Sequence, residues 1–224
     1  MPTEPALAVS ELFYSLQGES TYAGLPCVFI RLAGCNLRCR FCDARYTYVE
    51  AGRDVPLAEV LAYVGQYPGA MVEITGGEPL LQDTVIQLMH LLLAGQRQVL
   101  LETNGSCDIA SVPAGATVIM DVKCPGSGMS AAFRIENLAS LKAGDEIKFV
   151  ITSRKDYDWA VAFIKKHSLF APVTNKHPHP LLFSPVSGLL APADLAAWIL
   201  ADQLPVRLQL QLHKILWPGY ERGC

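Results

Sequence analysis

Short apolar runs rich in β-branched residues alternate along this chain with segments of helical periodicity, and no other feature constrains the fold as strongly. The apolar runs predict strands at Cys27–Leu32, Met71–Thr75, Val99–Thr103, Val118–Val122, Ile147–Ile151, Leu181–Phe183 and Val206–Leu212. The periodic segments predict helices at Leu57–Gln66, Asp83–Ala94, Ile135–Leu141, Asp156–His167 and Pro192–Asp202. Strands that alternate with helices indicate an α/β fold with a mostly parallel sheet. Because 224 residues are few for two ordinary domains, we expect one domain over residues 1–224.

Polar or glycine-rich motifs follow the first four predicted strands. They are Gly34-Cys35, Thr75–Pro79, Thr103–Gly105 and Lys123–Gly128. In α/β folds ligands bind at the carboxyl ends of parallel strands, where successive loops meet. The sequence therefore predicts that these four loops build one site.

The loop after the first predicted strand carries three cysteines within eight residues. Cys35, Cys39 and Cys42 have a C-x3-C-x2-C spacing. Thiolates favour soft metals and iron–sulfur clusters. Three cysteines in one tight loop can each bind one iron of a four-iron cluster, which leaves the fourth iron open to an external ligand. The spacing predicts a [4Fe-4S] cluster of this kind.

Structural zinc and simple burial are the alternatives for these cysteines. A structural zinc site normally has four ligands, and the chain has no second C-x2-C or histidine pair to supply one. Burial alone does not explain three thiols among the polar residues Asn36, Arg38 and Arg40. The other four cysteines are scattered, and we expect them to be inert; they are Cys27, Cys107, Cys124 and Cys224.

Charge and hydropathy exclude several classes of function. The formal net charge of −3 gives no global reason to expect nucleic-acid binding. The first nine residues lack the basic region and apolar run of a signal peptide, and polar residues break the longest apolar stretches well short of a membrane span. We expect a cytoplasmic protein that does not contact nucleic acid or membrane directly.

The cysteine spacing, the GGE run at residues 76–78 and Phe41 before the last cysteine together resemble the radical S-adenosylmethionine superfamily. The resemblance implies a partial (βα)6 TIM-like barrel, with a [4Fe-4S] cluster and S-adenosylmethionine as cofactors. It also implies that the radical is generated at the cluster-bound cofactor and that no side chain is itself catalytic. The protein then supplies position and shielding.

Further motifs resemble the 7-carboxy-7-deazaguanine synthase family almost from end to end. They are SLQGE at 15–19, VFIRLAGCN at 28–36, ITGGEPLLQ at 74–82, ETNG at 102–105, SPVSG at 184–188 and QLHK at 211–214. The resemblance implies a carbon–nitrogen lyase that converts 6-carboxy-5,6,7,8-tetrahydropterin into 7-carboxy-7-deazaguanine with release of ammonia, on the route to queuosine and other 7-deazapurines. S-adenosylmethionine is then used catalytically, and Mg2+ assists at the substrate carboxylate. A homodimer and an electron donor such as flavodoxin follow from the same resemblance.

The resemblance also assigns residues of this sequence to ligands. Cofactor contacts are expected at Phe41, Gly76, Gly77, Glu78, Asp121, Val122, Lys123, Ser184, Pro185, Val186 and Ser187. Contacts to the pterin substrate are expected at Leu16, Gln17, Gly18, Glu19, Arg31, Thr75 and His213. Arg31 suits this assignment, because a planar guanidinium binds a carboxylate bidentately and an unpaired charge within an apolar strand is costly. Glu19 could bind the guanidine-like edge of a pterin or be a plain turn carboxylate, and His213 could equally be a histidine at the edge of the sheet.

One position departs from the family pattern. Many members carry a threonine two residues after the last cysteine, and its hydroxyl binds magnesium, whereas this chain has Ala44. Asp43, Tyr46 or Thr47 could replace that oxygen. Substrate and water alone could also hold the ion, since magnesium keeps several waters.

Two other functions share parts of this pattern. A glycyl-radical-activating enzyme has the same cysteine spacing, but the SLQGE run and Arg31 suit a small carboxylated pterin better than a protein loop. A non-catalytic zinc or iron–sulfur module leaves the GGE run and the other strand-end motifs without a role.

Overall fold

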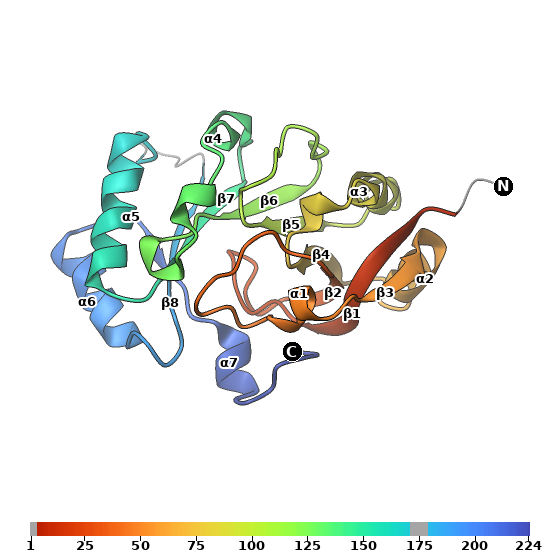
Figure 1. The fold of residues 1–224 in the computed structure, drawn as a ribbon, viewed down its shortest axis with the longest axis horizontal. Helices are drawn as coiled ribbons and strands as arrows, with labels where there is room; N and C mark the ends of the chain where they lie inside the picture. The colour runs from red at the N-terminus through yellow and green to blue at the C-terminus, as the bar shows by residue number, and fades with distance from the viewer. Residues whose placement is uncertain (1–3, 171–178) are drawn as a thin grey trace.

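The computed structural model describes residues 4–170 and 179–224, and its centre is one curved sheet of nine strands (Figure 1). The strands are β1 Ala6–Leu16, β2 Pro26–Leu32, β3 Arg53–Pro56, β4 Met71–Gly76, β5 Val99–Thr103, β6 Thr117–Asp121, β7 Glu146–Ile151, β8 Leu181–Pro185 and β9 Arg207–Leu208. The α-helices are α1 Tyr46–Val49, α2 Leu57–Gly65, α3 Thr84–Ala94, α4 Asn137–Ser140, α5 Arg154–Lys166, α6 Pro192–Ala201 and α7 Leu212–Leu216. Short 3-10 helices span Pro79–Leu81, Pro125–Ser127 and Ser130–Ala132.

The sheet runs in the order β3-β1-β2-β4-β5-β6-β7-β8-β9 and does not close on itself. Strands β1 and β3 are antiparallel additions at one edge, whereas every neighbouring pair from β2 to β9 is parallel. The α/β class and the incomplete barrel expected from the sequence are confirmed. The parallel arrangement brings the carboxyl ends of β2 and β4 to β8 to one side of the molecule.

Most predicted elements are present, but the two ends of the sheet differ from the prediction. Strand β1 was not predicted from the sequence, and its buried and half-buried positions do not alternate cleanly. The predicted strand Val206–Leu212 is wrong beyond Leu208, because the backbone N–H of Leu212 donates to the carbonyl of Gly18 and the chain turns into α7. The partner strand β8 also ends at Pro185, which has no N–H to continue the ladder.

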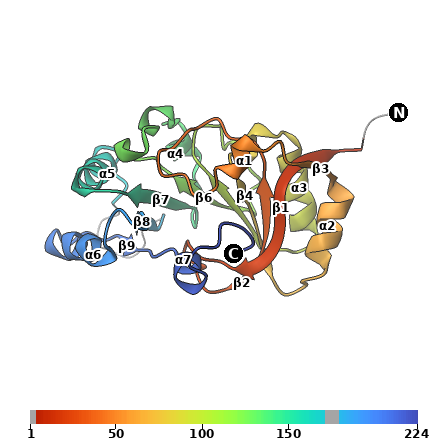
Figure 2. The ribbon, with the colours of Figure 1, turned by 60° about the horizontal axis from the view of Figure 1, so that its bottom comes forward.

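The outer face of the sheet carries the main apolar core. Side chains such as Ile30, Ile74, Leu101 and Phe149 are fully buried there, and they pack with apolar residues of α2, α3, α5 and α6. Figure 2 shows α7 apart from these helices, near the long strand β1 and the end of the chain. No helix among the described residues is both long and apolar enough to cross a membrane.

The inner face changes character along the strands. Near the amino ends of the strands, Phe13, Phe29, Met71, Leu100 and Ile119 form a small second apolar cluster. Towards the carboxyl ends the inward positions become charged or polar. Glu73, Thr75, Asp121 and Lys148 are buried there, and Glu102 is partly buried. This polar layer is the floor of the site described next.

Candidate active site

A cavity of about 690 Å³ opens at the carboxyl ends of the parallel strands. Its wall includes Cys35, Gly77, Asn104 and Lys123, one from each of the four motif-bearing loops. Helix α7 and the loop after β1 complete the wall. The four loops therefore meet in one place, as the strand-end motifs predict.

All three clustered cysteines line this cavity and are partly exposed to it. Backbone hydrogen bonds fix the loop that carries them: Gly34 N–H donates to Thr47 O at 2.6 Å, and Arg40 N–H donates to Ser127 O at 3.0 Å. Burial raises the pKa of Cys39 and Cys42 above that of a free thiol. The backbone hydrogen bonds therefore hold these thiols in a defined loop.

A single-ion site is not formed within residues 4–170 and 179–224, since no three His, Cys, Asp or Glu side chains there lie close enough to hold one metal ion. A single ion such as zinc needs ligands that converge on one point. In a cluster the cysteines bind different irons, so the thiolates need not converge.

Two adjacent glycines let the end of β4 pack directly against the cysteine loop. Gly76 has a φ of +142°, and a Cβ there would lie 2.2 Å from the carbonyl oxygen of Leu32. A Cβ at Gly77 would lie 2.0 Å from the carbonyl oxygen of Gly34 and 2.7 Å from the Cβ of Cys35. The bare backbone is thus required by protein packing and also leaves this part of the wall without side chains.

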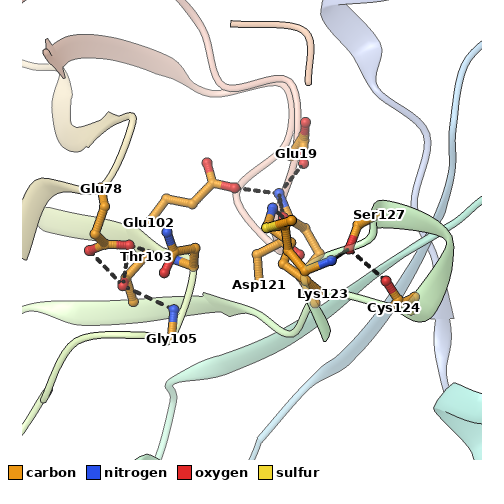
Figure 3. A network of polar contacts seen from close by, with 12 residues as sticks. Glu19, Glu78, Glu102, Thr103, Gly105, Asp121, Lys123, Cys124 and Ser127 are labelled. Atoms are coloured by element: carbon orange, nitrogen blue, oxygen red, sulfur yellow. Dashed lines mark hydrogen bonds and ion pairs between the residues drawn. The ribbon is translucent and has the colours of Figure 1, made fainter. Parts of the chain in front are cut away.

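Glu78 lies behind the wall and does not reach the cavity. Its carboxylate accepts hydrogen bonds from Thr103 Oγ1 at 2.8 and 2.9 Å (Figure 3). It also accepts from Asn104 N–H at 2.7 Å and from Leu80 N–H at 3.1 Å. Burial raises the pKa of Glu78, and these donors act in the opposite direction. Glu78 therefore ties the β4 loop to the β5 loop, where Asn104 Nδ2 lies 4.0 Å from Cys35 Sγ.

The other expected cofactor contacts fall into two groups: residues that line the cavity and residues that are buried away from it. Phe41, Gly76, Gly77, Asp121, Lys123, Val186 and Ser187 line the cavity. Val122 does not, because it follows Asp121 and packs into the helix-side core. Ser184 and Pro185 are likewise buried within β8 and lie outside the wall.

Asp121 leaves one acceptor open at the floor of the cavity. Its Oδ2 accepts a hydrogen bond from Lys123 Nζ at 2.8 Å. Its Oδ1 is buried, and no described residue hydrogen-bonds to it. A buried carboxylate oxygen without a donor is costly, so this atom suits a ligand N–H or O–H.

All seven expected substrate contacts line the cavity; they are Leu16, Gln17, Gly18, Glu19, Arg31, Thr75 and His213. The Gln17 side chain is already used by the protein, because its Nε2 donates to Glu73 and its Oε1 accepts the Glu19 N–H at 2.9 Å. Burial and the neighbouring carboxylate of Glu102 raise the pKa of Glu73 well above its ordinary value. Glu73 therefore keeps its proton to a higher pH than an exposed carboxyl does, and its side chain orients Gln17.

Arg31 presents a guanidinium whose bonding is incomplete. Its Nε lies 3.8 Å from Glu11 Oε2, beyond hydrogen-bond distance, and no described residue hydrogen-bonds to this buried nitrogen. The guanidinium carbon lies 5.6 Å from the centre of the Phe13 ring. An anion in the cavity would complete the donor set of Arg31.

A buried lysine that the sequence analysis did not identify lies at the centre of the polar floor. Lys148 Nζ donates to Glu19 Oε2 at 2.7 Å, also contacts Glu102, and lies 3.6 Å from Asp121 Oδ2. In Figure 3 the dashed lines from Glu19 and Glu102 meet at this nitrogen. The available signal was a charged residue at an inward position of an otherwise apolar strand, and Glu73 carries the same signal on β4.

The loop at Ala44 offers few oxygens for a magnesium ion. Thr47 Oγ1 donates to the Ala44 carbonyl at 2.7 Å and is buried. Asp43 is more than half exposed, lines the cavity and lies 3.5 Å from Lys214 Nζ. Of the residues considered as replacements for the missing hydroxyl, Asp43 has the most accessible oxygens.

Comparison with known proteins gives consistent matches. The family model described as the Radical SAM superfamily matches residues 29–113. The chain is 46% identical to the 7-carboxy-7-deazaguanine synthase of Koribacter versatilis, over 97% of this chain and 100% of that protein. It is 41% identical to the protein of the same name from Chlorobaculum tepidum, over 100% of both chains. The crystal structure of QueE from Escherichia coli has the same fold, with a TM-score of 0.72 and 23% identity over 93% of this chain and 95% of that one.

Proposed function

The chain belongs to the 7-carboxy-7-deazaguanine synthase family, and from this premise we propose how its own residues hold the cofactors and the substrate. It is a radical S-adenosylmethionine lyase of queuosine biosynthesis that forms 7-carboxy-7-deazaguanine from 6-carboxy-5,6,7,8-tetrahydropterin. Family membership implies a [4Fe-4S] cluster and S-adenosylmethionine as its cofactors.

Cys35, Cys39 and Cys42 are the proposed ligands of the cluster. Three observations support the proposal: the cysteines share one loop, backbone hydrogen bonds hold that loop in place, and all three thiols line the cavity. When bound, the cluster and S-adenosylmethionine supply the one-electron chemistry that starts the ring contraction.

The S-adenosylmethionine side of the cavity is assigned to Phe41, Gly76, Gly77, Asp121, Lys123, Val186 and Ser187. The open acceptor Oδ1 of Asp121 supports this assignment, since a cofactor hydroxyl or amino group would satisfy it. Glu78, Val122, Ser184 and Pro185 then act by shaping the wall rather than by touching the cofactor.

Arg31 is the main evidence for which part of the cavity binds the substrate. A partly buried guanidinium that faces the cavity with an unbonded Nε matches a small carboxylated molecule. Its neighbours in the wall, Glu19 and His213, then face the rest of a pterin ring. The geometry favours this small substrate over the glycyl-radical-activating alternative, which needs access for a protein loop.

A binding comparison tests this assignment. Wild type should bind 6-carboxytetrahydropterin more tightly than tetrahydropterin, which lacks the carboxylate. Arg31→Met should lose about 2 kcal/mol of affinity for the carboxylated compound alone, the scale of a charged hydrogen bond. Arg207→Met, at an exposed position on β9, is the control and should change nothing. Undiminished discrimination by Arg31→Met would contradict the assignment.

Magnesium is assigned to Asp43, the substrate carboxylate and water. The support is the accessible carboxylate of Asp43 and the engagement of the Thr47 hydroxyl with Ala44 O. Asp43→Asn should raise the magnesium concentration needed for half-maximal activity, and an unchanged requirement would oppose the assignment.

We also assign the chain an external one-electron donor such as flavodoxin, a homodimeric state and a cytoplasmic location. Three exposed arginines on and beside the cysteine loop support the first of these; they are Arg38, Arg40 and Arg45. Positive charge there suits a partner with an acidic surface. The substrate is a free small molecule, so no contact with tRNA is needed.

A further inference from the structure

Lys148 is a buried cation with carboxylates from three separate segments around it. It lies on the inner face of β7, and its side chain is only 4% exposed. Glu19 comes from the loop after β1, Glu102 from β5 and Asp121 from β6. A buried ammonium persists only when it is paired, so these contacts fix the position of Lys148 and of the carboxylates together.

The pairing is not shared equally among the three carboxylates. Asp121 has a closer partner in Lys123, at 2.8 Å against 3.6 Å for Lys148. Lys148 therefore serves chiefly Glu19 and Glu102. Two carboxylates so close together would repel each other without it, and one would take up a proton.

Glu19 is held from a second direction as well. Gln211 Nε2 donates to Glu19 Oε1 at 2.8 Å, while Lys148 binds Oε2. Each carboxylate oxygen can accept a second hydrogen bond, and Glu19 lines the cavity. Both oxygens are thus oriented by the protein and still able to accept from a ligand.

We propose that Lys148 is a positioning residue of the substrate site, which keeps Glu19 ionised and aimed at the adjacent N–H donors of a pterin-like heterocycle. This inference rests on the proposed function and adds to it the residue that sets recognition of the ring. Lys148 acts through Glu19 and does not itself touch the substrate.

The protonation state of Glu19 makes the role of Lys148 measurable as a pH dependence of binding. Burial alone would raise the pKa of Glu19, but the charge and hydrogen bond of Lys148, with that of Gln211, lower it to about 2. Without Lys148 the effect of burial dominates, and the Glu19 pKa rises. The variant should then bind a pterin well only when the pH is high enough to ionise Glu19.

The test uses the fluorescence of 6-carboxypterin, which has the same carboxylate and N–H edge as the substrate. Its dissociation constant is measured with wild type and Lys148→Met, each reconstituted with iron and sulfide. Between about pH 7.5 and about pH 5.5 the wild-type constant should change little, whereas that of Lys148→Met should rise about tenfold for each unit by which the pH lies below the new Glu19 pKa. Glu73, Asp121, Lys123 and His213 also face this region, and the charge of Lys148 acts on Glu73 and Lys123 as well as on Glu19.

Three further variants make the result decisive. Lys142→Met removes a lysine that pairs with Asp145 outside the cavity and should behave as wild type. Lys148→Arg keeps the charge and should restore binding that does not depend on pH. If Lys148→Met does not fold, Glu19→Gln provides the check and should bind weakly at both pH values. A Lys148→Met or Glu19→Gln protein with wild-type affinity at both pH values overturns the inference, whereas wild type that does not bind the probe at all contradicts the proposed function.

Discussion

The imidazole of His213 lies directly against the backbone of Gly18, so that a Cβ at Gly18 would fall 2.3 Å from His213 Nδ1. Helix α7 is joined to the loop after β1 at the same place, where Leu212 N–H donates to Gly18 O at 2.9 Å. Two segments almost 200 residues apart in the sequence thus form one wall of the cavity.

Gly18→Ala should therefore displace His213 and weaken binding of the pterin substrate. We expect about a tenfold rise in the dissociation constant, or ~1.4 kcal/mol. The cluster and the affinity for S-adenosylmethionine should be unchanged, because the cysteine loop is elsewhere in the wall. Gly69→Ala is the matched control, since a Cβ there meets nothing within 4 Å. Equal substrate affinity in both variants would show that the contact between Gly18 and His213 is dispensable.

Gly77→Ala tests the packing beneath the cysteine loop. The added methyl group would overlap the Gly34 carbonyl and the Cys35 Cβ, which are parts of the loop that cannot simply rotate away. Overpacking of this kind costs about 1–3 kcal/mol, so the loop should shift and the reconstituted protein should retain less iron and sulfide. Iron content is measured against the same Gly69→Ala control. Full iron retention would mean that the loop tolerates the displacement.

Much of this arrangement was predictable from the sequence, and the reasons for the exceptions are physical. The parallel strands and the cysteine loop are encoded locally, by apolar runs and by the spacing of Cys35, Cys39 and Cys42. Strand β1 was missed because it has no clear alternation, and α7 because its position is set by Gly18, far away in the chain. Local sequence does not encode such distant contacts.

The site residues show the same division. The substrate contacts expected from resemblance all line the cavity, although their roles stay predictions. Lys148 and Glu73 were missed because a charged residue within an apolar strand shows that a partner is needed, but not which residues of the neighbouring strands supply it. Glu78 is a different case, since the strand-end carboxylate expected to contact the cofactor accepts hydrogen bonds from Thr103, Asn104 and Leu80 and does not line the cavity.

Glu73 should make the stability of the apoprotein depend on pH. The folded state keeps the Glu73 proton well above pH 4.5, the ordinary value for the carboxyl, so unfolding releases a proton above that pH. The free energy of unfolding therefore falls as the pH rises from 4.5 through the folded-state pKa.

Glu73→Gln removes this proton and keeps an acceptor for Gln17. It should increase the free energy of unfolding at about pH 8 by on the order of 1 kcal/mol and change it little at about pH 5. Denaturant titrations at both pH values measure the effect. Glu59→Gln, at a half-exposed carboxylate on α2, should show no such difference between the two. An equal effect of Glu73→Gln at both pH values would argue against a neutral Glu73.

Cys35→Ala and Cys107→Ala separate cluster ligands from neighbouring thiols. Burial, with smaller effects of the nearby Glu78 and Cys35, raises the pKa of Cys107, but Cys107 is outside the cavity wall. Cys35→Ala should lose the iron–sulfur absorbance and the activity, whereas Cys107→Ala should keep both. A fully active Cys35→Ala protein would refute the cluster assignment.

The most direct test of the whole account is the product balance of one anaerobic reaction. The reconstituted and reduced protein is given S-adenosylmethionine and 6-carboxytetrahydropterin, and the products are followed by mass. 7-Carboxy-7-deazaguanine should form in large excess over 5′-deoxyadenosine, because S-adenosylmethionine is used catalytically. Cleavage of S-adenosylmethionine without any deazaguanine would contradict the account and would point to another substrate for this cavity.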